Sequence, residues 1–402
     1  MQKTEKNIIV PDRILGLMKR IEKRGEEVYL VGGSLRDLLL GKTPNDYDLA
    51  TSALPQKTAE IFCDRRVITT GLKHGTVTVM EEGEPIEITT FRIDGAYSDA
   101  RHPDGVTFTE RIEEDLSRRD FTVNAMAYHP TVGLIDPFGG KKDLGDQILR
   151  TVGEPNLRFE EDALRILRAF RFSAQLGFTI EEKTLEGCFN SKSGLTKVAK
   201  ERISSEFLRL LLSQSPAPSL QKMIEPGVSS FVFGEYLPSE RLLQSLSQIS
   251  AVDMVRLGLF FSECEEEEAR KILESLKYSK KQITGACAVV RGAKQKILSP
   301  ADARRLIANC GIYAENACRA SILLKNSPEE AMEWIDKQRG PTKISELKIS
   351  GNDLISLGFC GREIGRILQE LLALVIEDPT LNEKAKLLEM IEKKYQKLEI
   401  TN

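Results

Sequence analysis

The chain has 402 residues, of which 41% are hydrophobic and 29% are charged, and its formal net charge is −3. A chain of this length is too long for one ordinary domain, so we expect two to four. The small negative charge neither supports nor excludes a nucleic-acid partner, because phosphate contacts need a local basic surface rather than a basic chain. The first residues lack the apolar core of a signal peptide, and no run reaches the roughly 18 apolar residues of a membrane span.

The cysteines and histidines exclude several kinds of site. Seven cysteines are scattered along the chain without a CxxC pair, which argues against a disulfide framework and a zinc site and favours the cytoplasm. The three histidines, His74, His102 and His129, all lie in the first third, and none precedes an aspartate. We therefore expect no His–Asp metal hydrolase domain in the rest of the chain.

Secondary-structure signals change along the chain. The N-terminal part alternates helical segments with short β-rich runs, which are Val28–Val31, Asp46–Ala50, Thr76–Met80 and Ile86–Phe91. From Arg158 onward, helix-forming residues dominate to the end. The sequence thus predicts an α+β fold, in which a mixed-sheet head precedes an all-α C-terminal half.

Proline and glycine positions indicate where domains end. The candidate linkers are Pro216–Pro218, in SQSPAPS, and the pair Gly340–Pro341. Together with the change after the head, they predict four domains: a head over 1–151, a helical neck over 152–215, a helical body over 216–340 and a helical tail over 341–402.

The densest pattern in the chain is LVGGSLRDLLLGKTPNDYDLA, over residues 30–50. Gly32 and Gly33 follow a β-rich run and open a helix that carries Arg36. Glycines let the backbone approach a ligand closely, and amides at a helix start point toward a bound anion. A glycine pair before a helix is also a common tight connection, so its meaning depends on the residues after the helix.

Two aspartates, Asp46 and Asp48, come after this turn and its helix, in a short extended segment. Side chains two positions apart on a strand project to the same side, and two such carboxylates repel each other unless a cation intervenes. Alone, the pair is typical of a solvated turn after Pro44; behind the glycine pair, it predicts a magnesium site for phosphoryl transfer. Glu87, in the β-rich run IEITTF, is a third candidate acid, with a surface-facing position as the alternative.

The motifs GG-x-x-RD and D-Y-D are similar to the nucleotidyltransferase motif of the DNA polymerase beta superfamily. Three later segments narrow the resemblance to the class II tRNA nucleotidyltransferases and bacterial poly(A) polymerases: RRDFTVNAMA (118–127), DPFGG (136–140) and RFEEDALRILRAFRF (158–172). The matching motifs span residues 28–210, and the later helical half matches only in texture and length.

The resemblance implies that Asp46 and Asp48 bind two Mg²⁺ ions. One ion would activate the 3′-hydroxyl of tRNA, and the other would hold the triphosphate and stabilise the leaving pyrophosphate. Glu87 lies where the superfamily has its third carboxylate.

The same resemblance implies how the nucleotide is held. Arg119 would reach the triphosphate, because a guanidinium forks onto phosphate. Asp120 and Asn124 would position the nucleotide sugar, while helix capping is the alternative for either of them taken separately.

Glu161, Asp162 and Arg165 lie on a helix that we expect to begin near Arg158. Spacings of three and four residues should place both acids beside Arg165 on one face, which alone is typical of a surface ion pair. Cytosine and adenine both present an amino donor beside a ring-nitrogen acceptor, whereas guanine and uracil present a carbonyl beside an N–H. One carboxylate and one guanidinium can therefore accept C and A and reject G and U. In the resembling family this EDxxR motif has that role, so we predict that Asp162 and Arg165 read the base and that Glu161 orients Arg165.

Further arginines follow in the helical part of the chain. Arg168 and Arg171 either back the RNA terminus or face solvent. Arg202, in KERISSEF, is assigned by the resemblance to the family's next motif, a helix that supports the neck.

The segment Ile93–Asp115 is polar and has few apolar anchors, so we expect a mobile loop rather than core. In the resembling family, a loop at this position is associated with the switch from C to A addition. The segment is intact here, which disfavours an enzyme that adds only C.

The C-terminal half contains no recognisable RNA-binding module. Its basic clusters either contact phosphates or only favour solubility; they are Lys280–Lys281, Lys294–Lys296 and Arg304–Arg305. Family analogy places contacts with the tRNA elbow in the tail, where glycines would let the backbone approach a phosphate beside Arg362 and Arg366.

The resemblance therefore implies an enzyme that adds C, C and A from CTP and ATP to the 3′ end of tRNA and releases pyrophosphate. The alternatives are an enzyme that adds only the terminal A and a bacterial poly(A) polymerase. A third alternative, from a different class, is a catalytically silent RNA-binding protein with a vestigial head. The joint presence of the motif carboxylates, the glycine turn and Arg119 argues against the third.

Overall fold

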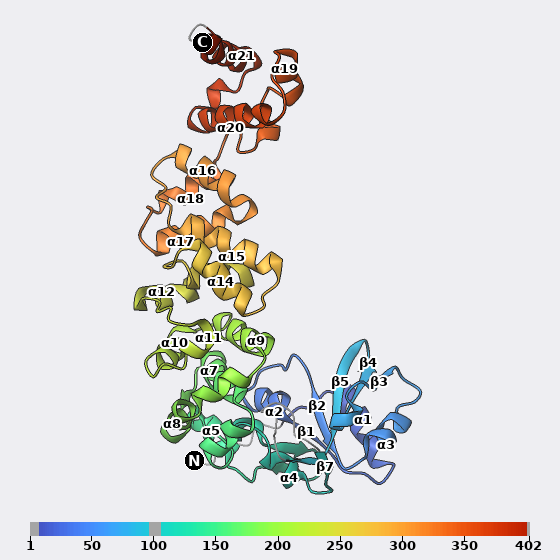
Figure 1. Cartoon of the computed structure of the whole chain (residues 1–402). Helices are drawn as coiled ribbons and strands as arrows, with labels where there is room; N and C mark the ends of the chain where they lie inside the picture. Colours follow the sequence, from blue (N-terminus) through green and yellow to red (C-terminus); the bar gives the residue numbers. More distant parts are fainter. Residues whose placement is uncertain (1–7, 96–105, 400–402) are drawn as a thin grey trace. The chain divides into compact units, whose positions relative to one another are not determined.

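The structure is a computed structural model that describes residues 8–95 and 106–399 (Figure 1). Contacts between Cα atoms divide the chain into two compact units. The first comprises Met1–Leu210 and Pro218–Val232, and the second comprises Leu211–Ala217 and Phe233–Asn402. The chain leaves the first unit at Leu211 and re-enters it at Pro218, so the segment that contains Pro216 is a crossing point between the units.

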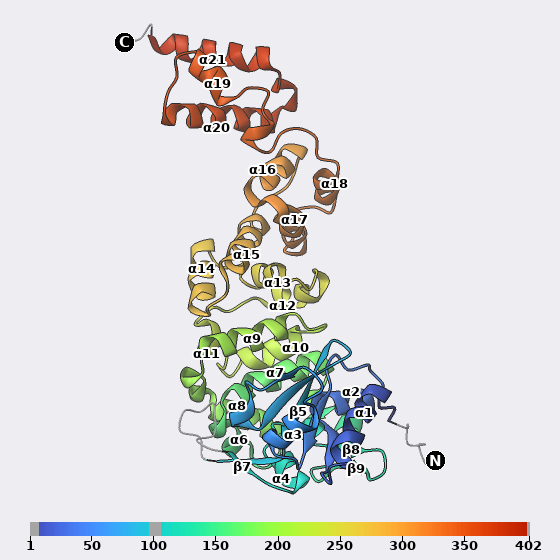
Figure 2. The same ribbon diagram turned by 90° about the vertical axis from the view of Figure 1, so that its right-hand side faces the viewer.

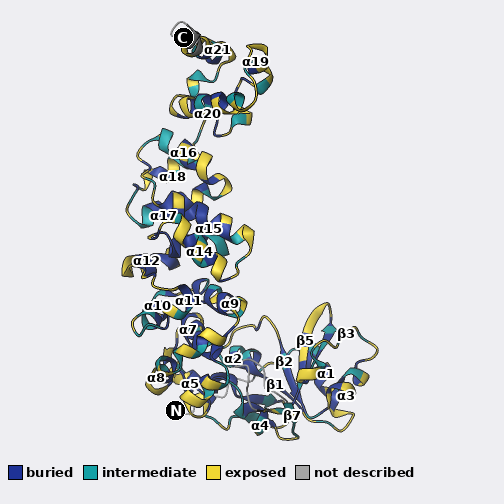
Figure 3. Cartoon of the chain, viewed as in Figure 1, coloured by how far each residue is buried: buried dark blue, intermediate teal, exposed yellow. Residues whose placement is uncertain are grey.

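The first unit is built on a seven-stranded mixed sheet, which confirms the predicted head. The strands run in the order β3-β4-β5-β2-β1-β8-β9, of which β1 to β5 are labelled in Figure 1. Strands β2 and β5 are parallel, and the other neighbouring pairs are antiparallel. Their bounds are β1 Val28–Val31, β2 Asp48–Thr51, β3 Val67–Ile68, β4 Thr76–Glu81, β5 Glu84–Thr90, β8 Ala127–His129 and β9 Gly133–Ile135. All of β1 is buried, as expected of an apolar run in the middle of a sheet (Figure 3).

Helices of the first unit cover this sheet and continue beyond it. Helix α1 buries Ile14, Leu17, Met18 and Ile21, a helical apolar stripe, and packs against α3 and β1. The helices that follow the head include α6 and α7, which carry the EDxxR motif. The bounds are α1 Asp12–Glu22, α2 Gly32–Leu39, α3 Pro55–Ile61, α4 Ile112–Ser117, α5 Gly140–Asp146, α6 Pro155–Glu161, α7 Leu164–Leu176, α8 Glu182–Asn190, α9 Lys200–Leu211, α10 Ala217–Ile224 and α11 Ser230–Phe233.

The expectation of a loop over Ile93–Asp115 is wrong for the described parts of that segment. Strands β6 (Arg92–Asp94) and β7 (Val106–Phe108) pair in antiparallel fashion, and helix α4 follows them. Ile112 and Leu116 of α4 join a core with Tyr29 and Val31 of β1, because two apolar residues four positions apart give even a short polar helix one buried face. Residues 96–105, which are ten of the 23 residues of this segment, lie outside the described residues.

Helices are the only regular secondary structure among the described residues of the second unit, as predicted for the C-terminal half. Its helices are α12 Glu240–Ser245, α13 Asp253–Phe260, α14 Glu266–Ser275, α15 Lys280–Ala293, α16 Pro300–Cys310, α17 Ala314–Leu323, α18 Glu330–Asp336, α19 Gly351–Ser356, α20 Arg362–Glu377 and α21 Lys384–Glu399. Close packing of α13 against α15 leaves no room for a side chain at Gly258, whose Cβ would lie 2.5 Å from Val289 Cβ. Helices α19, α20 and α21 close around a separate small core (Figure 2).

Two basic clusters of this unit are engaged within it. Arg304 is buried and donates hydrogen bonds to the carbonyls of Ile376 and Glu377, at 2.6 and 3.0 Å, where it caps the C-terminal end of α20. Lys294 pairs with Glu265 at 2.7 Å. Arg304 is therefore a structural cap of α20, which argues against a role as a phosphate ligand.

Nowhere in residues 8–95 and 106–399 does a helix have both the length and the apolar character that a membrane crossing requires.

Candidate active site

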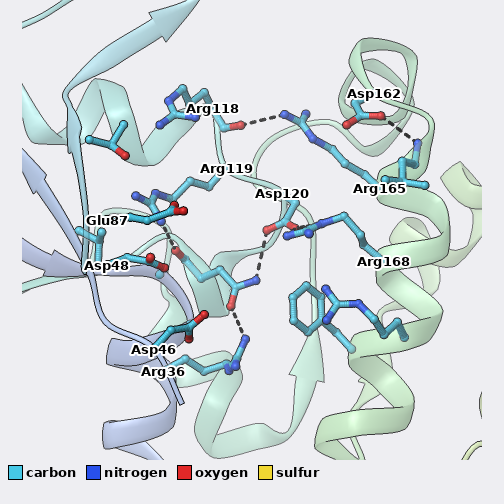
Figure 4. Close-up of a pocket in the computed structure, with 18 of the residues that line it drawn as sticks. Arg36, Asp46, Asp48, Glu87, Arg118, Arg119, Asp120, Asp162, Arg165 and Arg168 are labelled. Carbon is cyan, nitrogen blue, oxygen red and sulfur yellow. Dashed lines mark hydrogen bonds and ion pairs between the residues drawn. The ribbon is translucent and has the colours of Figure 1, made fainter. Parts of the chain in front are cut away.

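One cavity of the first unit, about 530 Å³ in volume, is lined by all the residues that the sequence marked as candidate metal or nucleotide ligands (Figure 4). These residues are Gly32, Gly33, Arg36, Asp46, Asp48, Glu87, Arg119, Asp120, Asn124, Asp162, Arg165 and Arg168. They come from the sheet, from α2, from the segment around the short 3-10 helix Thr122–Asn124 and from the α6–α7 region. Residues that are more than 130 positions apart in the sequence, such as Gly32 and Arg165, thus face one space.

The carboxylates lie where β2 and β5 run side by side. The parallel register places Asp48 opposite Glu87, and the antiparallel register places it opposite Val31, directly before the glycine pair. The predicted strand Asp46–Ala50 is wrong at its start, because β2 begins at Asp48 and Asp46 lies in a bend. Pro44, two residues earlier, cannot donate a ladder hydrogen bond and favours such a turn. Asp46 nevertheless lines the cavity with Asp48.

The electrostatics of this wall favour a cation. Burial and the charges of Asp46 and Glu87 together raise the pKa of Asp48 to about 6, although the charge of Arg119 acts in the opposite direction. Among the described residues, no three His, Cys, Asp or Glu side chains form a ready metal cage. Carboxylate oxygens are the ligands that Mg²⁺ prefers, and in phosphoryl-transfer sites substrate phosphates and water complete its shell. The residues present therefore fit a metal that binds together with its substrate.

The glycine turn brings this wall close to an arginine. Gly32 has φ +69°, and a Cβ there would lie 3.0 Å from Arg119 Nη1 and 3.4 Å from Asp48 Oδ2. A side chain at this position would meet both steric and backbone strain. The buried Nε of Arg119 has no hydrogen-bond partner within the described residues, and the same is true of Nη1 of Arg202. Both arginines line the cavity, and the protein supplies no acceptor for either of these buried N–H groups.

A series of side-chain hydrogen bonds along the cavity lining joins α2 to α7. Arg36 Nη1 donates to Asn124 Oδ1 at 2.8 Å, Asn124 Nδ2 donates to Asp120 Oδ1 at 3.2 Å, and Arg168 Nε donates to Asp120 Oδ2 at 2.7 Å. Neither Asp120 nor Asn124 caps the helix Thr122–Asn124. Burial would raise the pKa of Asp120, but the charge and hydrogen bonds of Arg168 outweigh it and lower that pKa to about 2.

The expected single helix through the EDxxR motif is wrong. Helix α6 ends at Glu161, Asp162 is extended with φ −143°, and α7 begins at Leu164. The Oδ1 atom of Asp162 accepts a hydrogen bond from Leu164 N at 3.0 Å, and this competition of a short polar side chain for backbone N–H groups interrupts the helix. Asp162 therefore does not share a helix face with Arg165; its Oδ2 accepts from Arg202 Nη2 at 2.9 Å.

Arg165 is held by other groups. Its Nη1 lies 2.5 Å from Glu161 Oε2, which agrees with the expected orienting role of Glu161, and its Nη2 donates to the carbonyl of Arg118 at 3.1 Å (Figure 4). Both Asp162 and Arg165 line the cavity, so the break in the helix still leaves the two polar groups facing the same space.

The sequence analysis did not mark Phe172 as a site residue, although its ring lines the cavity and lies close to three arginines. The guanidinium carbons of Arg36, Arg168 and Arg171 lie 5.3, 5.2 and 3.9 Å from its ring centroid. Arg171 is buried and pairs with Glu206 at 2.5 Å, so the solvent-facing alternative for it is excluded. The signal was present in the sequence, because Phe172 follows Arg168 by four residues on one helix.

Comparison with known proteins agrees with this geometry. Family models match three stretches: the poly A polymerase head domain at residues 28–150, a probable RNA- and SrmB-binding site of polymerase A at 177–239, and tRNA nucleotidyltransferase domain 2 at 255–391. The CCA-adding enzyme of Leuconostoc mesenteroides is 34% identical over 91% of this chain and 92% of its own length. That of Levilactobacillus brevis is 36% identical over 92% and 94%. The chain belongs to the CCA-adding enzyme family.

A solved structure of the family supports the same assignment for the whole fold. The crystal structure of the Bacillus stearothermophilus CCA-adding enzyme in complex with CTP matches with a TM-score of 0.82 and 30% identity, over 97% of this chain and all of that one. The chain is therefore a nucleotidyltransferase, and membership of this family implies the use of a divalent metal ion. The carboxylate wall described above is the part of the cavity that offers oxygen ligands for it.

Proposed function

We propose that this protein adds C, C and A in that order to the 3′ end of tRNA, using CTP and ATP and releasing pyrophosphate. We further propose Mg²⁺ as the metal and the cytoplasm as the compartment, in keeping with seven free cysteines. The observation that carries the proposal is the single cavity, where paired strand-end carboxylates, an arginine with an unpartnered N–H and the Asp162–Arg165 pair all meet. Membership of the CCA-adding family makes nucleotide addition to tRNA the reaction that this arrangement serves.

The carboxylate wall is the place of the chemical step. Asp46 and Asp48 would hold the divalent ions, with Glu87 in support. When bound, such ions make the attacking hydroxyl more acidic and neutralise charge on the leaving pyrophosphate. Arg119, whose guanidinium lies beside Gly32 and Asp48, would hold the triphosphate through its free Nε–H. The amides at the start of α2 would approach the same anion, since Gly32 keeps side chains away from it.

The opposite side of the cavity would select the base and hold the sugar. Asp162 would accept from the exocyclic amino group of C or A, and Arg165 would donate to the neighbouring ring nitrogen. Arg202 and Glu161 would keep these two side chains in place, because each forms an ion pair with one of them. Asp120 and Asn124, with Arg36 and Arg168 beside them, would position the ribose.

The remaining parts of the chain would bind the tRNA body. In this proposal residues 1–151 form the catalytic head, 152–215 the neck that reads the base, 216–340 a helical body and 341–402 a tail that contacts tRNA. Arg362 and Arg366 of α20 remain candidates for phosphate contacts in that tail.

One experiment separates the full reaction from its alternatives. Purified protein receives two tRNA transcripts, one that ends at the discriminator base and one that ends in CC, each with Mg²⁺ and with CTP, ATP or both. We expect the first transcript to gain three residues and stop, and the second to gain one. Addition of A to the CC transcript alone would identify an A-only enzyme, long A tracts would identify a poly(A) polymerase, and no extension at all would refute the proposed function.

A further inference from the structure

A buried carboxylate of the first unit with several hydrogen-bond partners lies outside the residues that the sequence marked as site residues. Asp115, on α4, is fully buried. Its Oδ1 accepts hydrogen bonds from Arg118 Nε and Nη2, at 3.1 and 2.7 Å, and from the backbone N of Arg92, at 3.3 Å. Its Oδ2 accepts from Arg119 Nη2, at 3.2 Å. One carboxylate thus holds two consecutive arginines and the start of β6.

Both arginines lead from Asp115 to the cavity. The other terminal nitrogen of Arg119, Nη1, donates to the carbonyl of Asn124 at 3.4 Å. Both terminal nitrogens of the guanidinium are therefore held, while its buried Nε has no acceptor within the described residues. Arg118 leads there through its backbone, because its carbonyl accepts from Arg165 Nη2 at 3.1 Å (Figure 4). Asp115 therefore contacts Arg119, the proposed triphosphate ligand, directly, and it is linked to Arg165, the proposed base-reading residue, through Arg118.

The third partner of Asp115 ties this arrangement to the β6–β7 hairpin. Arg92 begins β6, and its side chain donates to the carbonyl of His74. Phe108 of β7 packs against Gly75, where a Cβ would lie 2.9 Å from its ring. The described base of the hairpin is thus anchored to the sheet on one side and to Asp115 on the other.

We propose that Asp115 is a positioning residue, which orients Arg119 toward the triphosphate and, through the Arg118 carbonyl, Arg165 toward the base. It also couples both arginines to the β6–β7 hairpin. The inference deepens the proposed function and rests on it, since it assigns Arg119 and Arg165 to the nucleotide. Asp115 itself touches no substrate.

The negative charge is essential to this role. Burial would raise the pKa of Asp115, but the charges of Arg118 and Arg119 outweigh it and lower that pKa, so the side chain is ionised at neutral pH. An asparagine has the same shape but carries two donors on one arm, so it would present N–H groups to a guanidinium that also donates. One arginine would then lose its partner and turn, and the geometry of the cavity would change.

The test compares Asp115→Asn with Asp143→Asn in the full-length protein. Asp143 is also buried and also pairs with an arginine, Arg150, at 3.1 Å, but neither of them lines the cavity. With a CC-ending or discriminator-ending transcript, we expect Asp115→Asn to raise the KM for CTP and ATP about tenfold and to lower the preference for CTP over UTP about tenfold. Asp143→Asn should change the KM and the CTP-over-UTP preference by less than about twofold relative to wild type. It should nevertheless lower the melting temperature by about as much as Asp115→Asn does.

A second variant keeps the test decisive if Asp115→Asn does not fold. Arg118→Gln removes a partly exposed side chain, leaves the carbonyl in place and should shift the CTP-to-UTP preference more than the KM for CTP. The proposal is overturned if Asp115→Asn matches Asp143→Asn in both quantities, or if Arg118→Gln lowers the melting temperature and leaves the preference unchanged. Wild-type protein that extends no transcript would refute the proposed function instead, so the two failures are distinguishable.

Discussion

The two walls of the cavity differ in how far their carboxylates are neutralised by neighbouring arginines. On the strand side, Asp46, Asp48 and Glu87 line the cavity near one guanidinium, that of Arg119, and burial together with the neighbouring carboxylates raises the pKa of Asp48 to about 6. On the helical side, each carboxylate has an arginine partner, and the pKa of Asp120 falls to about 2. The carboxylates of the first wall repel one another, whereas those of the second wall are already paired with arginines.

This difference indicates how the work is divided. A wall of carboxylates that repel one another is stabilised when a cation binds, so it suits a metal that enters with the triphosphate. A wall whose charges are already paired holds its donors and acceptors in fixed positions, which is what the recognition of a base without a template requires. Substitutions on the two sides should therefore have different consequences for activity and stability.

The largest effect is expected on the strand side. Asp46→Ala or Asp48→Ala should lower the rate of nucleotide incorporation by roughly a thousandfold or more, because the remaining carboxylate cannot hold the metal ions in place. Circular dichroism should show an intact fold. Near-normal turnover of either variant at saturating Mg²⁺ would remove that residue from the site.

A smaller effect, on selectivity, is expected on the helical side. Asp162→Ala or Arg165→Ala should reduce the preference for CTP over UTP by about ten- to a hundredfold, since each removes one half of the base-edge pairing. Competition assays with both nucleotides measure this preference. Glu160→Ala is the matched control, because Glu160 is exposed and does not line the cavity. Full selectivity in both variants would mean that the base is read elsewhere.

The next effect concerns stability. Because the pKa of Asp120 is lowered from 3.8 to about 2 in the fold, its charge stabilises the protein above pH 4 by about 2 kcal/mol, and this contribution is lost as the pH falls toward 2. Asp120→Asn should therefore melt at a lower temperature than wild type at pH 7, and the gap should narrow between pH 4 and 2. A gap that stays constant over that range would show that the charge of Asp120 is not the cause.

The smallest effect is expected in the second unit. Arg304→Lys should lower the melting temperature by a few degrees, because an ammonium group cannot span the two carbonyls at the end of α20 as the guanidinium does. Affinity for tRNA, measured by filter binding, should change less than twofold. A large loss of affinity at unchanged stability would restore Arg304 as a phosphate ligand.

The two walls also differ in how far the sequence predicted them. The glycine turn and the two motif aspartates were predicted from residue spacing, since strand alternation and a turn act over a few positions. Glu87 was a candidate from its β-rich run, and its assignment as the third carboxylate came from the family resemblance. The break at Asp162 was not predicted, because a helical spacing pattern does not show that a side chain competes for a backbone N–H. The pairing of Asp162 with Arg202 and the burial of Asp115 depend on contacts 40 and 23 residues apart, which the sequence carries no local signal for. The loop expected over Ile93–Asp115 failed for the same reason, since its apolar anchors meet residues of β1.

The most direct test of the difference between the walls is the melting temperature of Asp48→Asn without divalent metal. Removing a buried charge that its neighbours oppose should leave the melting temperature equal to wild type or higher in EDTA, and Mg²⁺ with CTP should then stabilise wild type more than the variant. A fall in EDTA as large as that of Asp120→Asn at pH 7 would contradict the account, because it would show that Asp48 is already satisfied within the protein.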